Sequence, residues 1–167
     1  IRDRVYREWA PGATAMHLIG DFNNWNRTSH PMKAVGNGNW EIEIPGVRTL
    51  KHRGKVKVAV TSPRGTEDRI PLYATYVVQD EKTHNFSAAI WNPRKEFVWT
   101  DEKFRPKKNV PPLIYEAHVG MATEEERVGT YLEFMRDILP RIKKDGYNTV
   151  QLMAIMEHPY YASFGYQ

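Results

Sequence analysis

Residues 55–61 read KVKVAVT, and they form the clearest β-strand pattern in the chain. The three valines alternate with Lys57 and Ala59, which predicts a strand with one buried face and one exposed face. Residues 40–44 (WEIEI) alternate in the same way. Three further segments are short and rich in β-branched or aromatic residues, and they too predict strands: 4–9, 15–19 and 75–79.

Turn residues separate these segments, at positions 11–12, 23–24, 36–38 and 63–65. Glycine and asparagine are frequent there, and both tolerate the positive φ that tight turns require. Short strands joined by regular turns, with no helical pattern between them, predict an antiparallel β-sandwich. We assign this domain to residues 1–100.

The character of the sequence changes after this domain. Residues 101–112 (DEKFRPKKNVPP) are charged and rich in proline, which predicts a linker. A strand pattern at 113–120, a helical pattern at 130–144 and an apolar run at 148–156 follow, so residues 113–167 predict a βαβ unit with parallel strands. Pro140 lies inside the helical pattern and predicts a kink or a break.

The composition excludes several classes of protein. Lys and Arg number 24 against 20 Asp and Glu, and these charges are scattered, so we expect no nucleic-acid partner. No apolar run approaches the roughly 20 residues of a membrane span, so we expect no membrane partner. The chain has no cysteine, and its 6 histidines lack ligand-like spacing, so we expect neither a metal site nor a cofactor.

Four strings carry a resemblance to known families. REWAPGA (residues 7–13) and GDFNNWN (20–26) resemble the family 48 carbohydrate-binding module, an immunoglobulin-like sandwich. IYEAHVG (114–120) and LPRIKKDGYNTVQLMAIMEHPYYASFGYQ (139–167) resemble the first two strands of the catalytic (β/α)8 barrel of glycogen and starch branching enzymes, in glycoside hydrolase family 13. The resemblance implies a mainly β fold, with the sandwich followed by the first βαβ portion of an incomplete barrel.

The resemblance also implies an activity for the parent protein, of which the chain would be an N-terminal fragment. Such enzymes cleave an α-1,4-glucan through a covalent glycosyl intermediate and transfer the chain to form an α-1,6 branch. The nucleophile and the acid of that family would lie beyond Gln167, so we expect the chain itself to be inactive and at most to bind α-1,4-glucan (glycogen, starch or malto-oligosaccharides). A non-catalytic glycogen-binding module and an α-glucan debranching hydrolase are the alternatives. The expected compartment is the cytoplasm, or the plastid of a plant.

Three aromatic residues near the end of the chain are candidate substrate-binding residues. Tyr166 matches the family tyrosine whose ring packs on the sugar at the cleavage point, while His158 and Tyr160 are candidates for lining the cleft. An aromatic ring suits this task because the C–H face of glucose presents an apolar patch to its π-face.

Six candidate glucan-binding residues lie on the sandwich. Trp9 and Pro11 resemble residues that contact oligosaccharide in branching-enzyme modules, and Trp25 matches a tryptophan of glycogen-binding regulatory subunits. The remaining candidates are Asn37, Asn39 and Trp40, although Trp40 shares a strand face with two isoleucines, which favours a place in the core.

A βαβ unit without the rest of its sheet leaves strand edges and apolar faces uncovered. We therefore expect the chain to self-associate.

Overall fold

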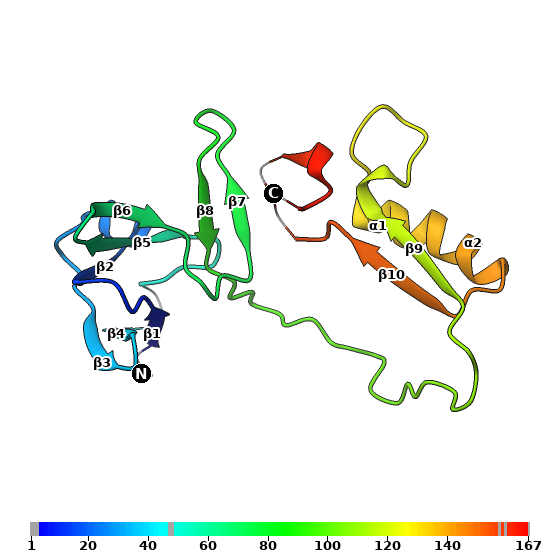
Figure 1. Cartoon of the computed structure of the whole chain (residues 1–167), viewed down its shortest axis with the longest axis horizontal. Coiled ribbons are helices and arrows are strands. Elements are labelled where there is room, and N and C mark those ends of the chain that lie inside the picture. The colour runs from blue at the N-terminus through cyan, green and yellow to red at the C-terminus, as the bar shows by residue number, and fades with distance from the viewer. Residues whose placement is uncertain (1–3, 47–48, 157, 159, 167) are drawn as a thin grey trace. The chain divides into compact units, whose positions relative to one another are not determined.

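The computed structural model describes residues 4–46, 49–156, 158 and 160–166. The chain divides into two compact units, the first ending at Val98 and the second beginning at Trp99 (Figure 1).

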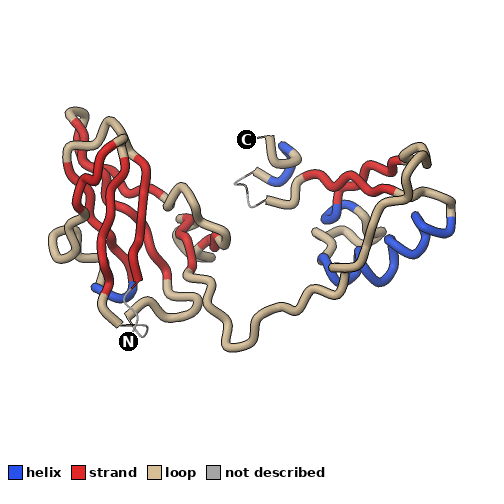
Figure 2. Tube along the Cα trace, turned by 90° about the horizontal axis from the view of Figure 1, so that it is seen from below, coloured by secondary structure: helices blue, strands red, loops and turns tan. Residues whose placement is uncertain are grey.

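The first unit contains two antiparallel sheets. One has the order β1 (Arg4–Trp9), β4 (Asn39–Ile44), β3 (Lys33–Gly36). The other has the order β2 (Ala15–Gly20), β5 (Lys55–Ser62), β8 (Phe86–Ala89), β7 (Val77–Gln79), and β6 (Gly65–Arg69) also pairs with β5. A short 3-10 turn, η1 (Asp21–Asn23), follows β2. This arrangement confirms the mainly β fold and the predicted sandwich (Figure 2).

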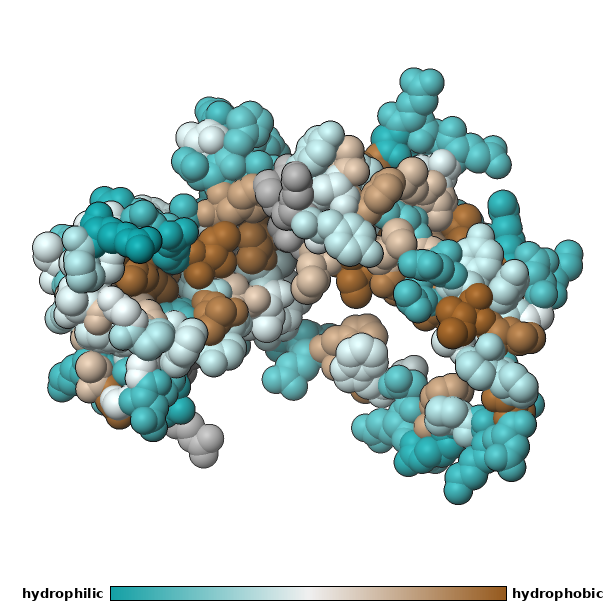
Figure 3. Space-filling model, viewed as in Figure 1, coloured by the Kyte–Doolittle hydropathy of each residue, from teal (hydrophilic) through white to brown (hydrophobic). Residues whose placement is uncertain are grey.

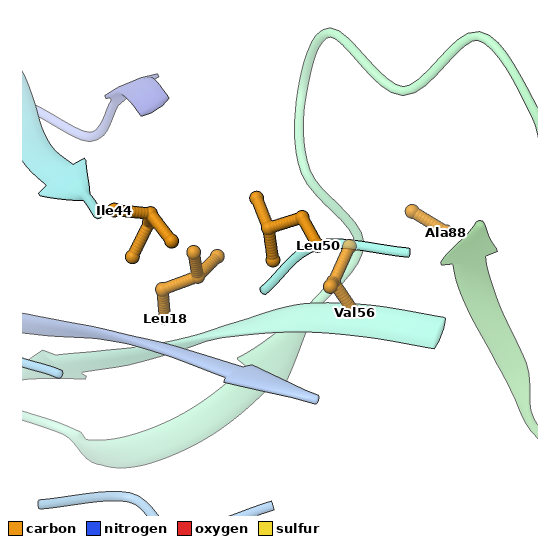
Figure 4. Packing of buried hydrophobic residues seen from close by; sticks show 5 residues of the cluster. All are labelled: Leu18, Ile44, Leu50, Val56 and Ala88. Carbon is orange, nitrogen blue, oxygen red and sulfur yellow. The ribbon is translucent and has the colours of Figure 1, made fainter. Parts of the chain in front are cut away.

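The core of this unit lies between the two sheets. Leu18 of β2 and Ile44 of β4 are fully buried and belong to one cluster with Leu50, Val56 and Ala88 (Figure 4). Burying side chains of this kind contributes roughly 1.5–3 kcal/mol each. The two alternating segments of the sequence therefore supply strands that face each other across the core.

One detail of the predicted pattern is wrong. Ala59 was expected on the exposed face of β5, but its side chain is only 1% exposed, while Val60 is half-buried. Ala59 lies in a central strand, between His17 of β2 and Asp68 of β6 in register, so the larger neighbouring side chains cover its methyl group.

The second unit is a parallel strand–helix–strand unit, as predicted. β9 (Ile114–His118) pairs with β10 (Thr149–Met153), and η2 (Val119–Met121) follows β9. Between the strands lie α1 (Tyr131–Glu133), the π-helical turn η3 (Phe134–Ile138) and α2 (Leu139–Lys144). A last 3-10 turn is η4 (Tyr161–Ser163).

The helical segment is irregular just before Pro140, as predicted. The Leu139 N–H bonds the Phe134 carbonyl, five residues back, so the helix is wider by one residue over this turn. Proline has no N–H, and its ring crowds the carbonyl four residues earlier, which explains the position of the irregularity.

The wider turn also changes which side chains face the strands. Phe134 and Ile142 are buried against Ala117 and Val119. Leu132 and Met135, which belong to the apolar pattern of the sequence, are 70% and 57% exposed. Hydrophobic surface thus remains visible on this unit (Figure 3).

Candidate functional site

Trp9 and the turn between β3 and β4 form the centre of the candidate site on the first unit. Trp9 ends β1, is 50% exposed, and lies opposite Asn39 at the start of β4. Its indole Nε1 donates to the Asn37 carbonyl at 3.2 Å, and the Ala10 N–H donates to the Gly38 carbonyl at 2.8 Å. The indole is therefore fixed against the turn while much of its surface stays open.

Gly38 lies directly against the two predicted sugar-contacting residues. A Cβ atom at this position would be 2.9 Å from Cβ of Pro11 and 3.0 Å from Nε1 of Trp9. Its φ of +76° also disfavours any residue with a side chain. The structure therefore brings together Trp9, Pro11, Asn37, Gly38 and Asn39, which we call the Trp9 group.

The two asparagines of the Trp9 group have different surroundings. Asn37 is exposed and has a φ of +52°, a conformation that asparagine tolerates well. The side-chain amide of Asn39 donates to the Gly36 carbonyl at 3.3 Å, so it stabilises the turn. The Asn37 side chain is thus the freer of the two for a ligand.

Trp40 lies on the inner face of β4, in contact with the cluster of Met16, Met32 and Val58. Its Nε1 donates to the Ala10 carbonyl at 3.1 Å. The Trp40 indole therefore fixes the backbone of Ala10, the residue between Trp9 and Pro11.

Trp25 lies in the turn after η1. Its Nε1 donates to Asp21 Oδ1 at 3.2 Å, its φ is +59°, and its side chain is half-buried. Among the described residues, no hydrogen bond or ring contact joins Trp25 to the Trp9 group, so Trp25 is a separate candidate on this unit.

Glu8 is a supporting residue that sequence reasoning missed. Glu8 is only 4% exposed. Its carboxylate accepts hydrogen bonds from the Tyr6 hydroxyl at 2.7 Å and from the backbone N–H groups of Trp9 and Leu72, both at 3.0 Å. The signal was available: Tyr6 and Glu8 share the inward face of a strand with period two. A depression of about 240 Å³ lies beside them, with Trp9 and Leu72 in its wall.

Burial raises the pKa of the Tyr6 hydroxyl well above its ordinary value of 10.0, and the hydrogen bond to Glu8 and its negative charge add to the effect. Tyr6 therefore stays a hydrogen-bond donor to Glu8 throughout the neutral range.

On the second unit, the predicted residues lie in the loop after β10. Tyr166 is 85% exposed and Tyr160 is 58% exposed. His158 is half-buried, its Nδ1 lies 2.9 Å from the Met156 carbonyl, and its ring stacks on Tyr161 with the ring centroids 6.1 Å apart. His158 is thus packed into the loop, while the two tyrosines present open rings.

Tyr161 joins this loop to the end of β9. Its ring meets the His118 ring edge-on with centroids 5.4 Å apart, and Phe164 contacts the same histidine at 5.1 Å. The Tyr161 hydroxyl lies against the backbone of Gly120, where a Cβ atom would overlap it. We call His118, Gly120, His158, Tyr161 and Phe164 the loop cluster. Gly120 and Phe164 lie within the strings that carry the resemblance but were not among the candidate residues.

The two histidines of the loop cluster have solvent-shielded nitrogens without a hydrogen-bond partner among the described residues: both nitrogens of His118 and Nε2 of His158. Burial also raises the pKa of Tyr161. Across the described part of the chain, no three His, Asp or Glu side chains are grouped so that they could hold a metal ion. No described helix is long and apolar enough to cross a membrane.

The first unit matches a known family model. Residues 2–74 match carbohydrate-binding module 48, the isoamylase N-terminal domain. Solved structures of low sequence identity show the same fold: a pullulanase from Bacillus acidopullulyticus (TM-score 0.67, 22% identical, covering 93% of this chain and 21% of that one) and a pullulanase from group B Streptococcus (0.66, 19%, 93% and 23%). The first unit thus matches the carbohydrate-binding module 48 family over residues 2–74.

Curated relatives cover nearly the whole chain. It is 51% identical to the 1,4-alpha-glucan-branching enzyme of Rhizophagus irregularis and 48% identical to that of Aspergillus oryzae, over 99% of its length in both cases. It is 47% identical over 97% of its length to the chloroplastic/amyloplastic branching enzyme 2-2 of Arabidopsis thaliana. These matches confirm the resemblance to 1,4-alpha-glucan-branching enzymes, and the chain spans about a quarter of the length of the first two relatives.

Proposed function

We propose that this chain supplies the glucan-binding module and the first strand–helix–strand portion of the catalytic barrel of a 1,4-α-glucan branching enzyme. The module would be residues 1–100, the linker 101–112 and the barrel portion 113–167. The division of the chain between Val98 and Trp99 supports this assignment. The compartment would be the cytoplasm, or the plastid if the source is a plant.

The observation that carries the proposal is the Trp9 group, on a chain about half identical to branching enzymes. A half-exposed indole held beside a proline offers an apolar platform for the C–H face of a glucosyl unit. The exposed Asn37 side chain beside it can bond sugar hydroxyls. The preferred ligand is therefore a linear α-1,4-glucan.

In the whole enzyme, a retaining transfer requires a carboxylate nucleophile and a carboxylic acid facing the same glycosidic bond. No residue of this chain matches either group of the family, so the chain would contribute binding and position. Tyr166, with its open ring, would pack on the sugar at the cleavage point.

The binding test is calorimetric titration of the chain with maltoheptaose. We expect saturable binding that weakens at least about tenfold in Trp9→Ala, because stacking and platform area are lost. Trp91→Ala is the matched control, since Trp91 is also about half exposed and lies outside the Trp9 group. Equal binding by the wild-type chain and Trp9→Ala would refute the assignment of this surface.

The products of the whole enzyme distinguish branching from two other functions, glycogen binding alone and debranching. A purely glycogen-binding protein would leave amylose unchanged, and a debranching hydrolase would remove α-1,6 linkages. A branching enzyme increases α-1,6 linkages at a constant number of glucosyl units, which proton NMR of the product measures.

A further inference from the structure

A second cavity in the first unit lies away from the Trp9 group. It has a volume of about 540 Å³, and it opens between η1, the loop before β5 and the residue after β8. Phe22, Leu50, Val56 and Ile90 provide an apolar wall, and these side chains continue into the core of the sandwich. The volume lies within the range of roughly 300–1,000 Å³ that is typical of small-molecule sites.

The loop before β5 gives this cavity a positive rim. Lys51 and Arg53 both line it, and among the described residues neither side chain has a carboxylate partner. Lys55 also lines the cavity, but its ammonium lies 3.4 Å from Asp80. Two cations within three residues of each other therefore form no ion pair within the described part of the chain.

Asp21 is the acidic residue in the described lining, so Lys51 and Arg53 outnumber it and the rim keeps a net positive charge. Asp21 accepts a hydrogen bond from Trp25 Nε1 at 3.2 Å through Oδ1, and from the Lys55 backbone N–H at 2.8 Å through Oδ2. Both oxygens are engaged in holding η1 to the start of β5. An anionic ligand would thus meet Lys51 and Arg53 while Asp21 keeps its own partners.

His52 adds a neutral donor to the same rim. Its Nδ1 accepts from the Asn92 N–H at 3.0 Å, so the proton of the neutral imidazole lies on Nε2. The ring also meets Trp91 edge-on, with centroids 5.0 Å apart, which limits its rotation. The Nε2–H is consequently available to a hydroxyl or a phosphate oxygen.

We propose that this cavity binds a sugar phosphate, with the phosphate monoester held by Lys51 and Arg53 and the sugar ring against the apolar wall. A phosphate monoester carries up to two negative charges, and arginine pairs with its oxygens through two parallel donors. The C–H face of a hexose fits the side of the cavity formed by Phe22 and Ile90. Its volume of about 540 Å³ suits a small molecule rather than a folded partner.

The experiment titrates the chain with glucose 6-phosphate, glucose and inorganic phosphate separately, following binding by calorimetry and by the ring resonances of His52. We expect glucose 6-phosphate to bind at least about tenfold more tightly than either component alone, because the rim and the wall are engaged together. In Lys51→Gln/Arg53→Gln, its affinity falls at least about tenfold, since charge-assisted hydrogen bonds are lost.

Lys33→Gln/Arg64→Gln is the matched control: it removes the same charge from exposed positions of the same unit outside the cavity lining. Equal affinity loss in both double variants would show a general charge effect and overturn the proposal. Inorganic phosphate binding as tightly as glucose 6-phosphate would also overturn it, since no sugar site would exist. Trp9→Ala should leave the affinity for glucose 6-phosphate unchanged, which separates this site from the proposed glucan site.

A malto-oligosaccharide carrying a 6-phosphate identifies the source of the ligand. Binding as tight as that of glucose 6-phosphate would assign the site to phosphorylated glucan, and exclusion of the longer chain would assign it to the free metabolite.

Discussion

Glu8 connects the strand that carries Trp9 to the segment after β6. Its buried carboxylate accepts hydrogen bonds from the backbone N–H groups of Trp9 and Leu72 and from the Tyr6 hydroxyl. The position of the Trp9 indole therefore depends on this carboxylate. Stability of the first unit and geometry of the Trp9 group should therefore change together when this carboxylate is altered.

Glu8→Gln should lower the free energy of unfolding of the first unit by about 1–3 kcal/mol, because an amide nitrogen replaces an acceptor and leaves a buried N–H unpaired. Urea denaturation followed by tryptophan fluorescence measures the change. Glu43→Gln, an exposed position of the neighbouring strand, should change the stability by less than about 0.5 kcal/mol. Equal effects of the two substitutions would contradict the role of Glu8.

Tyr6 gives this unit a dependence on alkaline pH. Its folded-state pKa is raised above 10.0, so above pH 10 the unfolded state loses the proton that the folded state retains. Stability is therefore complete below pH 10 and falls as the pH rises beyond it, by up to about 1.4 kcal/mol per pH unit. Tyr6→Phe should make this decline shallower, while Tyr73→Phe, at an exposed tyrosine, should leave it unchanged. Unfolding measured between pH 9 and 11 distinguishes the two.

Gly120 is the position that the Tyr161 ring requires. Gly120→Ala should cost about 1–3 kcal/mol, because the added Cβ overlaps the hydroxyl and forces the loop cluster apart. Tyr161→Phe in the same chain should recover part of the loss, since it removes the atom in closest contact. Gly12→Ala is the control, with open space around its Cβ position. If the double variant recovered no stability, the cost of Gly120→Ala would not come from the contact with the Tyr161 hydroxyl.

At the scale of elements, the sequence predicted strands with an alternating, β-branched or apolar pattern and missed a strand that is polar throughout. The alternation in β4 and β5 was sufficient because both strands face one core. β6 (GTEDR) is polar throughout and became a strand only through pairing with β5, which no local pattern encodes. The π-helical turn places Phe134 on the buried face of the helical segment. A pattern that assumes a regular helix cannot predict this change.

The same limit applies to the candidate site. Trp9, Pro11 and the turn at 37–39 were recognisable as strings, and the structure brings them together. Glu8 and Leu72 are 64 positions apart, and their hydrogen bond depends on how two sheets close, so the support of the site was outside the reach of local reasoning. Whether each candidate contacts a sugar stays a prediction.

The first turn of the helical segment should lose stability in acid. The Arg127 side chain, together with the Thr130 N–H and hydroxyl, lowers the pKa of Glu133 from 4.5 to about 2. The stabilisation is present above pH 4.5 and is lost as the pH falls through this window, because the unfolded state takes up the proton first. Glu133→Gln should remove this pH dependence from the helical circular dichroism signal, and Glu126→Gln should retain it.

At the scale of the whole molecule, exposed apolar side chains on the strand pair favour self-association. Ile114 of β9 is 51% exposed, and β9 and β10 pair with each other alone among the described strands. We expect sedimentation velocity to show concentration-dependent dimers or larger species. Ile114→Lys should shift the chain toward the monomer, and Val5→Lys, an equally open position on β1, should not. A monomeric wild-type chain at high micromolar concentration would contradict this expectation.

The close approach of Gly38 to Trp9 and Pro11 has a consequence for how this surface can evolve. Any substitution at position 38 introduces a Cβ, and that Cβ meets both the indole of Trp9 and the ring of Pro11. Substitutions that change the proposed ligand preference of this surface should therefore occur at positions 37 and 39, whose side chains border the same turn. Position 38 should remain glycine. Natural variation in glucan preference among such modules should be concentrated on either side of an unchanging glycine.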